Sequence, residues 1–216
     1  MAHFLSRTES TQHTSRASAK RDQILSGARR VFLRDGFAAA STDAIAAEAK
    51  VSKRTLYAHY LSKEELFAGV MRDLTIENPQ TRALESMEEI APGSEDELRR
   101  DLLELATKIV ATMTQPDYLA LLRTTIADTH RFPQLGGLFR ASVPERAMWS
   151  FAVLIERSRE RGMIGPDVDG ETAARIFVGP LLTYAVLDGL LAEGPPRPPA
   201  QEKIEEIVEI YMKAIT

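Results

Sequence analysis

The spacing of the apolar residues constrains this chain most, because it follows the period of an α-helix along most of its length. Ile24, Ala28, Val31 and Phe32 fall at positions i, i+4, i+7 and i+8, which places them on one face of a helix. Similar spacings recur further along, and no stretch alternates apolar and polar residues as a half-buried strand does. The pattern predicts an all-α fold of about nine helices without internal repeats.

The bulk composition excludes several classes of protein. The chain has 216 residues, 44% of them hydrophobic, enough for the cores of one or two domains. It has no cysteine, which excludes disulfides and cysteine-based metal sites or nucleophiles and suits a reducing cytoplasm. We expect no apolar run long enough to span a bilayer, and the first twenty residues lack the apolar core of a secretory signal, so we expect no membrane partner.

Charge is distributed unevenly along the chain, whose formal net charge is −4. Residues 1–76 carry 12 Lys and Arg against 8 Asp and Glu, a balance of +4. Residues 77–216 carry 15 against 23, a balance of −8. A basic amino-terminal part on an acidic body indicates that the amino-terminal part binds phosphate groups, although chance segregation of charged residues could give the same charge balances.

Three regions follow from composition and capping signals. Residues 1–19 are rich in Ser and Thr and are expected to form a flexible arm, in which Arg7, Arg16 and the adjoining Lys20 could touch DNA. Residues 20–76 are expected to form one domain, and residues 77–216 a larger helical domain.

The domain at 20–76 has helix start and stop signals in the order expected of a helix-turn-helix. A helix from Asp22 should stop at Gly36, and a short helix should begin at Ser41 or Thr42 and end at Ala49. Ser52 is a natural cap for a second short helix, Lys53–Tyr60. A capping box, Ser62 to Glu65, then begins a further helix. Two short helices joined by about three residues after a longer one are typical of this motif.

The larger domain is predicted to contain further helices in the same way. Helices should follow the capping box Ser94–Glu97, run from Pro116 to about Asp128, and run from Pro144 to a stop at Gly162, with a break through "HRFPQLGGLF" (130–139). Residues 171–192 are apolar on nearly all sides, with a kink or local break expected at Pro180. A last helix, 201–215, is apolar on one face.

The second short helix concentrates side chains that suit DNA. Beside the inward Leu56 and Tyr60, its remaining face offers Lys53, Arg54, Thr55, Tyr57, Ala58 and His59. Arg pairs with guanine, hydroxyls donate to phosphate, and an alanine can lie against a thymine methyl. Lys63 begins the next helix, where free backbone N–H groups also favour phosphate. A solvated cationic face is the alternative for each residue alone.

Residues 24–71 closely resemble the DNA-binding domain of the tetracycline-repressor-like (TetR) family, since "TDAIAAEA", "VSKRTLYAHY" and "SKEELF" occur in register. The resemblance implies a homodimeric regulator. It implies backbone contact by Thr42, operator reading by Lys53, Arg54 and Thr55, phosphate contacts by Tyr57 and His59, and a phosphate clamp at Lys63. The full expected DNA-binding set is Thr42, Ser52, Lys53, Arg54, Thr55, Tyr57, Ala58, His59 and Lys63.

One residue departs from the family pattern. The family often has Gly in the turn, where this chain has Lys50. If the position needs a positive φ, lysine costs about 1 kcal/mol relative to glycine.

The carboxy-terminal part carries a weaker resemblance. Residues 117–178 look like the AefR-like subtype of the family, which implies a small-effector site between helices and dimerisation through the last two helices. The helices at 171–192 and 201–215 also carry more apolar surface than one bundle face needs, although a well-buried core helix is the alternative. Candidates to line a pocket for an apolar effector are Met113, Tyr118, Leu122, Arg123, Phe139, Met148, Trp149 and Phe151, with Thr125 or His130 as further polar contacts.

These observations predict a ligand-responsive transcriptional regulator, a repressor released from a palindromic DNA operator by a small molecule. The helix from Ser62 to about Asn78 should link its two domains. A helical small-molecule-binding protein without DNA binding is the alternative. An enzyme is not expected, since the four histidines (3, 13, 59 and 130) are scattered and no GxSxG, phosphate loop or HExxH occurs. We therefore predict no metal, no cofactor and no catalytic residues.

Overall fold

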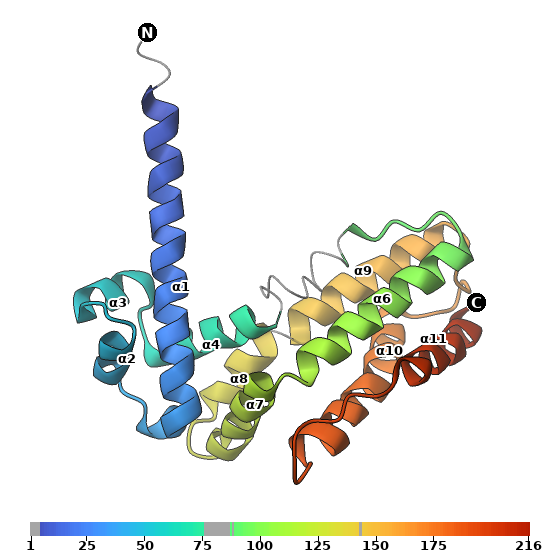
Figure 1. The fold of residues 1–216 in the computed structure, drawn as a ribbon. Helices are drawn as coiled ribbons and strands as arrows, with labels where there is room; N and C mark the ends of the chain where they lie inside the picture. The colour runs from blue at the N-terminus through green and yellow to red at the C-terminus, as the bar shows by residue number, and fades with distance from the viewer. Residues whose placement is uncertain (1–4, 76–86, 88, 143) are drawn as a thin grey trace. The chain divides into compact units, whose positions relative to one another are not determined.

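The computed structural model describes the backbone of residues 5–75, 87, 89–142 and 144–216, and side chains from Ser18 onward apart from Ser142. Over these residues the chain is helical and has no strand, which confirms the predicted all-α class (Figure 1). The number of helices in these ranges is close to that expected. The chain divides into two compact units, Met1–Val70 and Met71–Thr216, so the division falls within a helix rather than after residue 76.

The amino-terminal unit contains α1 (Leu5–Ala39), α2 (Thr42–Glu48), α3 (Lys53–His59) and most of α4 (Lys63–Leu74). Helix α1 is broken where predicted, because Gly36 has φ 74° and is not helical. Of residues 1–19, which were expected to form a flexible arm, those from Leu5 onward belong to α1, and residues 1–4 lie outside the described residues. No glycine or proline occurs between Leu5 and Ser26, so nothing in that stretch stops the helix.

A small aromatic cluster forms the core of this unit. Phe32 of α1, Phe37 just after Gly36, and Phe67 of α4 are fully buried, with ring centroids 5.1 to 6.0 Å apart. Leu56 of α3 is buried as well, so α3 is fixed by its inward face while its other face stays outside. The aromatic core therefore holds α3, the second helix of the motif, through its buried face.

The carboxy-terminal unit contains α6 (Glu95–Met113), α7 (Pro116–Thr129), α8 (Gln134–Ser142), α9 (Pro144–Glu160), α10 (Gly170–Ala185), the π-helical turn η1 (Val186–Leu190) and α11 (Gln201–Ile215). Its predicted start signals are confirmed. Ser94 accepts a hydrogen bond from the Glu97 N–H at 3.2 Å, and the Glu97 carboxylate accepts one from the Gly93 N–H at 2.7 Å. The capping box is thus closed one residue further back than usual.

A second aromatic cluster holds this unit together. Phe151 of α9, Phe177 of α10 and Tyr211 of α11 are buried, with centroids 4.7 Å apart for the two phenylalanines and 4.9 Å for Phe177 and Tyr211. Leucines of α6, among them Leu98 and Leu102, join the same core. Helices α6, α9, α10 and α11 therefore form one bundle around shared apolar side chains.

Two expected interruptions are absent from the described part of the carboxy-terminal unit. Gly136 and Gly137 lie inside α8 rather than in a break, which is confined to residues before Gln134. A Cβ on Gly136 would lie 3.3 Å from Cγ2 of Thr129, so this glycine serves the close packing of α8 on α7. Helix α10 continues through Pro180, and the irregular turn comes later, at η1.

The continuous helix also corrects the expectation about membrane-spanning length. Gly170–Leu190 is long and apolar enough to cross a membrane by length and composition. Only 33% of its most apolar window is buried, so much of its apolar surface has no cover from the residues that the structure describes.

Candidate nucleic-acid interface

The turn between α2 and α3 has a left-handed geometry, which glycine adopts more readily than other residues. Lys50 has φ 52°, a left-handed conformation that no other non-glycine among the described residues adopts. The Lys50 N–H donates to the Ala47 carbonyl at 3.0 Å, and the Val51 N–H donates to the Ala46 carbonyl at 2.9 Å. This pair of bonds is a Schellman motif, which ends α2 sharply and turns the chain into α3.

The end of α9 provides an internal comparison for this turn. There Gly162 has φ 74°, its N–H donates to Arg159, and the Met163 N–H donates to Ser158. The hydrogen bonds match those around Lys50, but the left-handed position is filled by glycine. Lys50 therefore carries a side chain where the same chain elsewhere uses none, at a cost of about 1 kcal/mol.

Two hydroxyls fix the start of α3. The Ser52 hydroxyl accepts from the Thr55 N–H at 3.0 Å and lies 2.8 Å from the Thr55 hydroxyl. Ser52 is thus the predicted helix cap, and Thr55 is oriented by it. These two contacts therefore fix the conformation of the first turn of α3.

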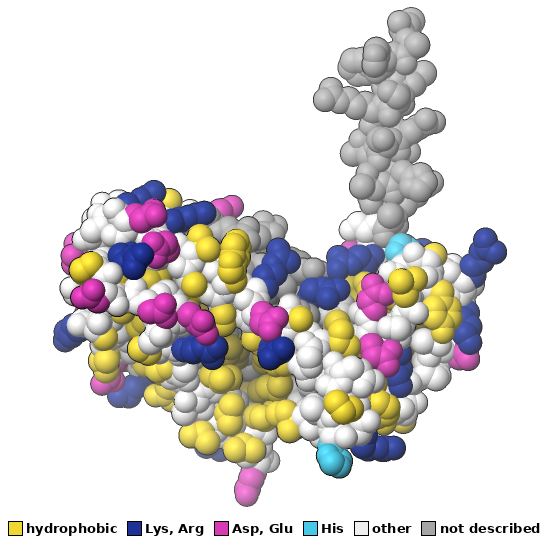
Figure 2. Space-filling view, turned by 180° about the vertical axis from the view of Figure 1, so that it is seen from behind, with side chains coloured by type: hydrophobic (Ala, Val, Ile, Leu, Met, Phe, Trp, Pro, Cys, Tyr) yellow, Lys and Arg dark blue, Asp and Glu magenta, His cyan; other side chains and the backbone are white. Residues whose placement is uncertain are grey.

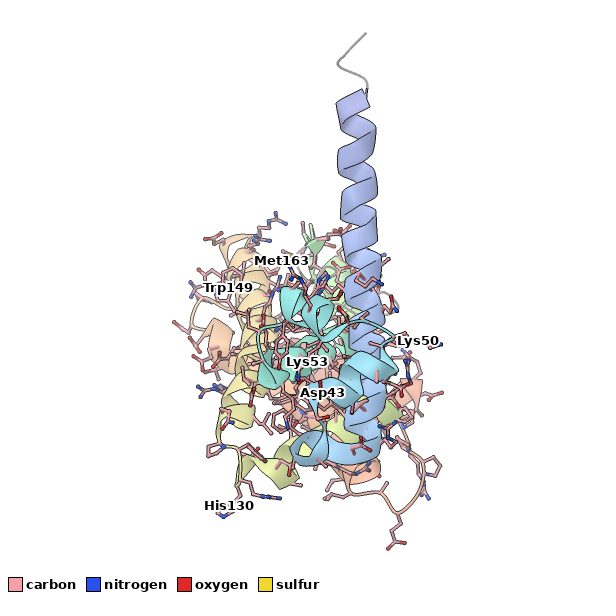
Figure 3. The ribbon with its side chains drawn as sticks, turned by 90° about the vertical axis from the view of Figure 1, so that its left-hand side faces the viewer. Asp43, Lys50, Lys53, His130, Trp149 and Met163 are labelled. Atoms are coloured by element: carbon pink, nitrogen blue, oxygen red, sulfur yellow. The ribbon has the colours of Figure 1, made fainter. Side chains whose placement is uncertain are left out.

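The first two residues of α2 bind the outer face of α3. The Lys53 ammonium lies 2.9 Å from a carboxylate oxygen of Asp43 (Figure 3). The Thr42 and Tyr57 hydroxyls are 3.2 Å apart. Hydrogen bonding to Asp43, reinforced by its charge, raises the pKa of Lys53. Lys53 and Tyr57 are one helical turn apart, so both contacts fall on the same face of α3.

The other predicted residues of α3 are placed differently. Arg54 is exposed and has no side-chain partner among the described residues. Ala58 is exposed, Tyr57 is 41% exposed, and His59 and Thr55 are partly buried. Within the described chain, Arg54 is consequently the cation of α3 that is free to meet a phosphate or a base.

Lys63 has partners that the sequence did not suggest. Its ammonium donates to the carbonyls of Phe37 at 2.8 Å, Ala40 at 3.0 Å and Ala38 at 3.4 Å, and it lies 4.4 Å from the Phe37 ring centroid. An ammonium has three N–H groups to donate, and three carbonyls receive them here. In this structure Lys63 therefore closes the end of α1, and the expected phosphate clamp would require these bonds to be exchanged.

Other cations of this unit are also paired. Arg30 and Arg34 both lie near Glu48, at 2.6 and 3.6 Å, and Arg34 also pairs with Asp35 at 2.8 Å. These arginines lower the pKa values of Glu48 and Asp35, chiefly through hydrogen bonds from Arg30 and Arg34 respectively. The positive balance of the unit is therefore less available to a ligand than the sequence count suggests.

Asp43 is the residue that sequence reasoning missed. It is exposed in the first turn of α2, where an acidic residue favours the helix, and this is the ordinary reason to pass over it. Its contact with Lys53 depends on the turn geometry that brings residues ten apart together. The sequence carries no signal for this contact, because it depends on how the turn places α3 against α2.

The residues predicted to line an effector pocket do not share one environment. Phe151 belongs to the aromatic core cluster, Tyr118 is buried, and Trp149 is 67% exposed. Arg123 donates to the Gly189 and Leu190 carbonyls, each at 2.9 Å, and so binds the end of η1. Met113, Leu122, Phe139 and Met148 are partly buried, Thr125 is buried with its hydroxyl bonded to Leu121, and His130 is exposed.

The described residues of the carboxy-terminal unit form at least two surface depressions, and none of those candidates lines either of these two. The larger, about 680 Å³, is lined by charged residues of α6 and by residues 89–92. The smaller, about 320 Å³, is lined by Pro180, Thr183, Tyr184, Leu187, Asp188 and Ile207. The smaller one lies on the apolar helices α10, η1 and α11.

These last helices expose a large apolar surface. The exposed large apolar residues on them are Ile176, Leu182, Leu187, Leu191 and Ile210. Figure 2 shows apolar side chains gathered on one part of the surface of this unit. We call these five residues the apolar face, because exposed large apolar residues gathered on neighbouring helices are candidates for an interaction site.

Comparison with protein families agrees with this geometry. Residues 24–70 match the family described as "Bacterial regulatory proteins, tetR family". Residues 93–209 match "Tetracyclin repressor-like, C-terminal domain". The finer AefR-like assignment stays a prediction.

Three similar proteins extend this result. The HTH-type transcriptional regulator UidR of Escherichia coli K12 is 28% identical over 182 residues, 82% of this chain and 84% of that protein. The repressor SCO4008 of Streptomyces coelicolor is 45% identical over 65 residues, 28% of this chain and 34% of that protein. The structure of the flavonoid-responsive regulator FrrA is 29% identical with a TM-score of 0.65, covering 92% of this chain and 98% of that one.

The second family model alone spans more than half of the chain, and the first spans the helix-turn-helix described above. Regulators of this family bind DNA operators and act as dimers. The chain belongs to the TetR family of bacterial regulatory proteins, and it is a transcriptional regulator with a DNA-binding helix-turn-helix rather than an enzyme.

Proposed function

We propose that this protein is a repressor in the cytoplasm that binds a palindromic operator as a homodimer and is released by a small molecule. The observation that carries the DNA-binding part is Arg54 at the capped start of α3, which is exposed and has no side-chain partner in the described chain. A recognition helix presents its amino-terminal residues to the bases, and arginine is the side chain that most often pairs with guanine there.

The remaining contacts divide by chemistry. Thr55 and Lys53 stand beside Arg54 as further base-reading groups, and Ala58 can meet a thymine methyl. Thr42, Tyr57 and His59 supply groups that suit phosphates, and Ser52 holds the helix start. Lys63 supports these contacts by holding the end of α1, and it reaches phosphate only if it gives up carbonyl partners.

The test is selection of duplex DNA from a random pool by the full chain. The expected winner is a palindrome whose half-site centres lie about 34–36 Å apart. Arg54→Ala should weaken binding to it by about tenfold or more. Arg157→Ala, which removes an exposed arginine of α9 in the other unit, is the matched control and should bind as the wild type does. If no sequence is enriched, the alternative of a helical small-molecule-binding protein without DNA binding takes its place.

Dimerisation is proposed to occur through α10, η1 and α11. The apolar face supports this, as does the low burial of the long helix Gly170–Leu190. Leu187→Asp should shift the sedimenting species from dimer to monomer, since it places a charge in the apolar face. Ile126→Asp, at an exposed apolar residue of α7, is the control and should remain dimeric. A dimer unaffected by Leu187→Asp would place the interface elsewhere.

The effector is proposed to be a small, largely apolar molecule bound in the carboxy-terminal unit, near the partly buried Met113, Leu122, Phe139 and Met148. The likeness to the flavonoid-responsive FrrA makes flavonoids the first compounds to test. Helix α4 runs from one unit into the other and is the proposed mechanical link. A flavonoid that raises the melting temperature of the free protein should also weaken operator binding. A compound that binds without altering operator affinity would refute the release mechanism.

A further inference from the structure

Asp43 is an acidic residue on the face that meets DNA in the proposed function, on which this inference rests. Its side chain is 72% exposed, and its two carboxylate oxygens lie 2.9 and 3.1 Å from the Lys53 ammonium. Lys53 is the first residue of α3 and is 52% exposed. The pair is therefore open to solvent and to an approaching duplex.

An exposed ion pair of this kind adds little to folding stability, because water screens both charges. Its effect on DNA binding is larger. A phosphate that approaches Lys53 must replace the carboxylate as its partner, and the released carboxylate then faces a polyanion. Lys53 thus contributes less to sequence-independent binding than a free lysine does.

The cations next to Lys53 are not held by a carboxylate as Lys53 is. Arg54, the next residue along α3, has no partner in the described part of the chain, and neither has Lys50 at the turn. Figure 3 shows Asp43 beside Lys53, with Lys50 projecting away from both. Among the described residues, the helix start therefore carries one cation held by a carboxylate and one free cation next to it.

We propose that Asp43 is a specificity-determining residue, which lowers the affinity for arbitrary DNA by holding Lys53. It acts through Lys53 and is in that sense a positioning residue. On the operator, the loss of the Asp43–Lys53 ion pair is compensated, because the released carboxylate near the base edges can accept a hydrogen bond from the amino group of cytosine. On arbitrary sequence no such compensation exists, and the repulsion between carboxylate and phosphate remains.

The experiment measures binding of the full chain to a random-sequence duplex over a range of NaCl concentrations. Asp43→Ala should bind it roughly five-fold more tightly, the change expected when one unit charge about 4 Å from another is removed in water. The slope of log K against log salt should steepen by about 0.9, equivalent to one more phosphate neutralised. Affinity for the selected operator should rise less, so that the ratio of operator to random-sequence affinity falls.

Asp35→Ala is the matched control. Asp35 is an aspartate of the same unit, paired with Arg34 at 2.8 Å, and its removal changes the net charge by the same amount. It should leave the salt slope near the wild-type value, whereas Asp43→Glu should restore the wild-type slope. The melting temperature of Asp43→Ala should fall only slightly, since the variant loses one exposed first-turn carboxylate of α2, and a protein that is still folded at the assay temperature excludes an effect through unfolding.

The outcomes separate this inference from the proposed function. If the wild type binds no DNA at low salt, the proposed function itself fails. If the wild type binds DNA but Asp43→Ala matches Asp35→Ala in slope and in operator preference, Asp43 has no role in specificity and the inference is overturned.

Discussion

Replacing Lys50 by glycine should stabilise the amino-terminal unit. Lys50 has φ 52° in the turn that ends α2, and a left-handed conformation costs an L-residue roughly 1–2 kcal/mol. Glycine removes that cost but loses about 0.4–1 kcal/mol through the greater freedom of the unfolded chain. The hydrogen bonds of the turn are backbone bonds, from Lys50 to Ala47 and from Val51 to Ala46, and they are unaffected. The net gain should be about 0.5–1 kcal/mol.

The assay is native-state hydrogen exchange of buried amides in α1 and α2, which gives the free energy of opening for this unit. Trp149, the chain's single tryptophan, belongs to the other unit, and its fluorescence during urea unfolding serves as an internal reference. Lys50→Ala is the control, because it removes the charge but keeps the Cβ. Equal gains for Lys50→Gly and Lys50→Ala would mean that charge, not backbone strain, is the cause. A loss of protection in Lys50→Gly would refute the reasoning altogether.

Three further predictions concern stability. Lys63→Met should lower the free energy of unfolding by about 1–3 kcal/mol, since it leaves the carbonyls at the end of α1 without their donor; urea unfolding followed by circular dichroism measures this. Gly27→Ala should cost about 1–3 kcal/mol in the same assay, because the added Cβ would lie 2.6 Å from Cβ of Ala49 and push α1 from α2; a wild-type midpoint would contradict it. Burial raises the pKa of Tyr118 to about 12, so its stabilising contribution is complete below about pH 10 and is lost as pH rises from about 10 to 12. Tyr118→Phe should reduce the loss of stability over that window, and an unchanged alkaline transition would show that Tyr118 does not control it.

The sequence predicted the parts of this molecule that depend on local chemistry. Ser52 and Ser94 cap helices because their hydroxyls reach N–H groups three residues away, which spacing alone reveals. The positive φ of Lys50 was expected from the glycine that the family often has there. Gly36 and Gly162 end helical stretches for the same conformational reason.

The parts that the sequence did not predict depend on residues far apart in the chain. Lys63 binds carbonyls 23 to 26 residues earlier, and Arg123 binds carbonyls 66 and 67 residues later. Such contacts follow from packing, so residue type suggested a phosphate or an effector where the structure has a backbone partner. The glycines of α8 suggested a break in the helix, whereas Gly136 is explained by the close packing of α8 on α7.

The central claim is that α3 reads DNA through Arg54. The most direct test is the affinity of wild type, Arg54→Lys and Arg54→Ala for the selected operator and for operators altered at one guanine at a time. The claim predicts that Arg54→Ala loses discrimination at one base pair of each half-site, by about 1–3 kcal/mol, while the other positions keep theirs. Arg54→Lys should retain affinity better than it retains that discrimination, since lysine keeps the charge without the bidentate fork. Equal binding of all three proteins to every operator would contradict the claim.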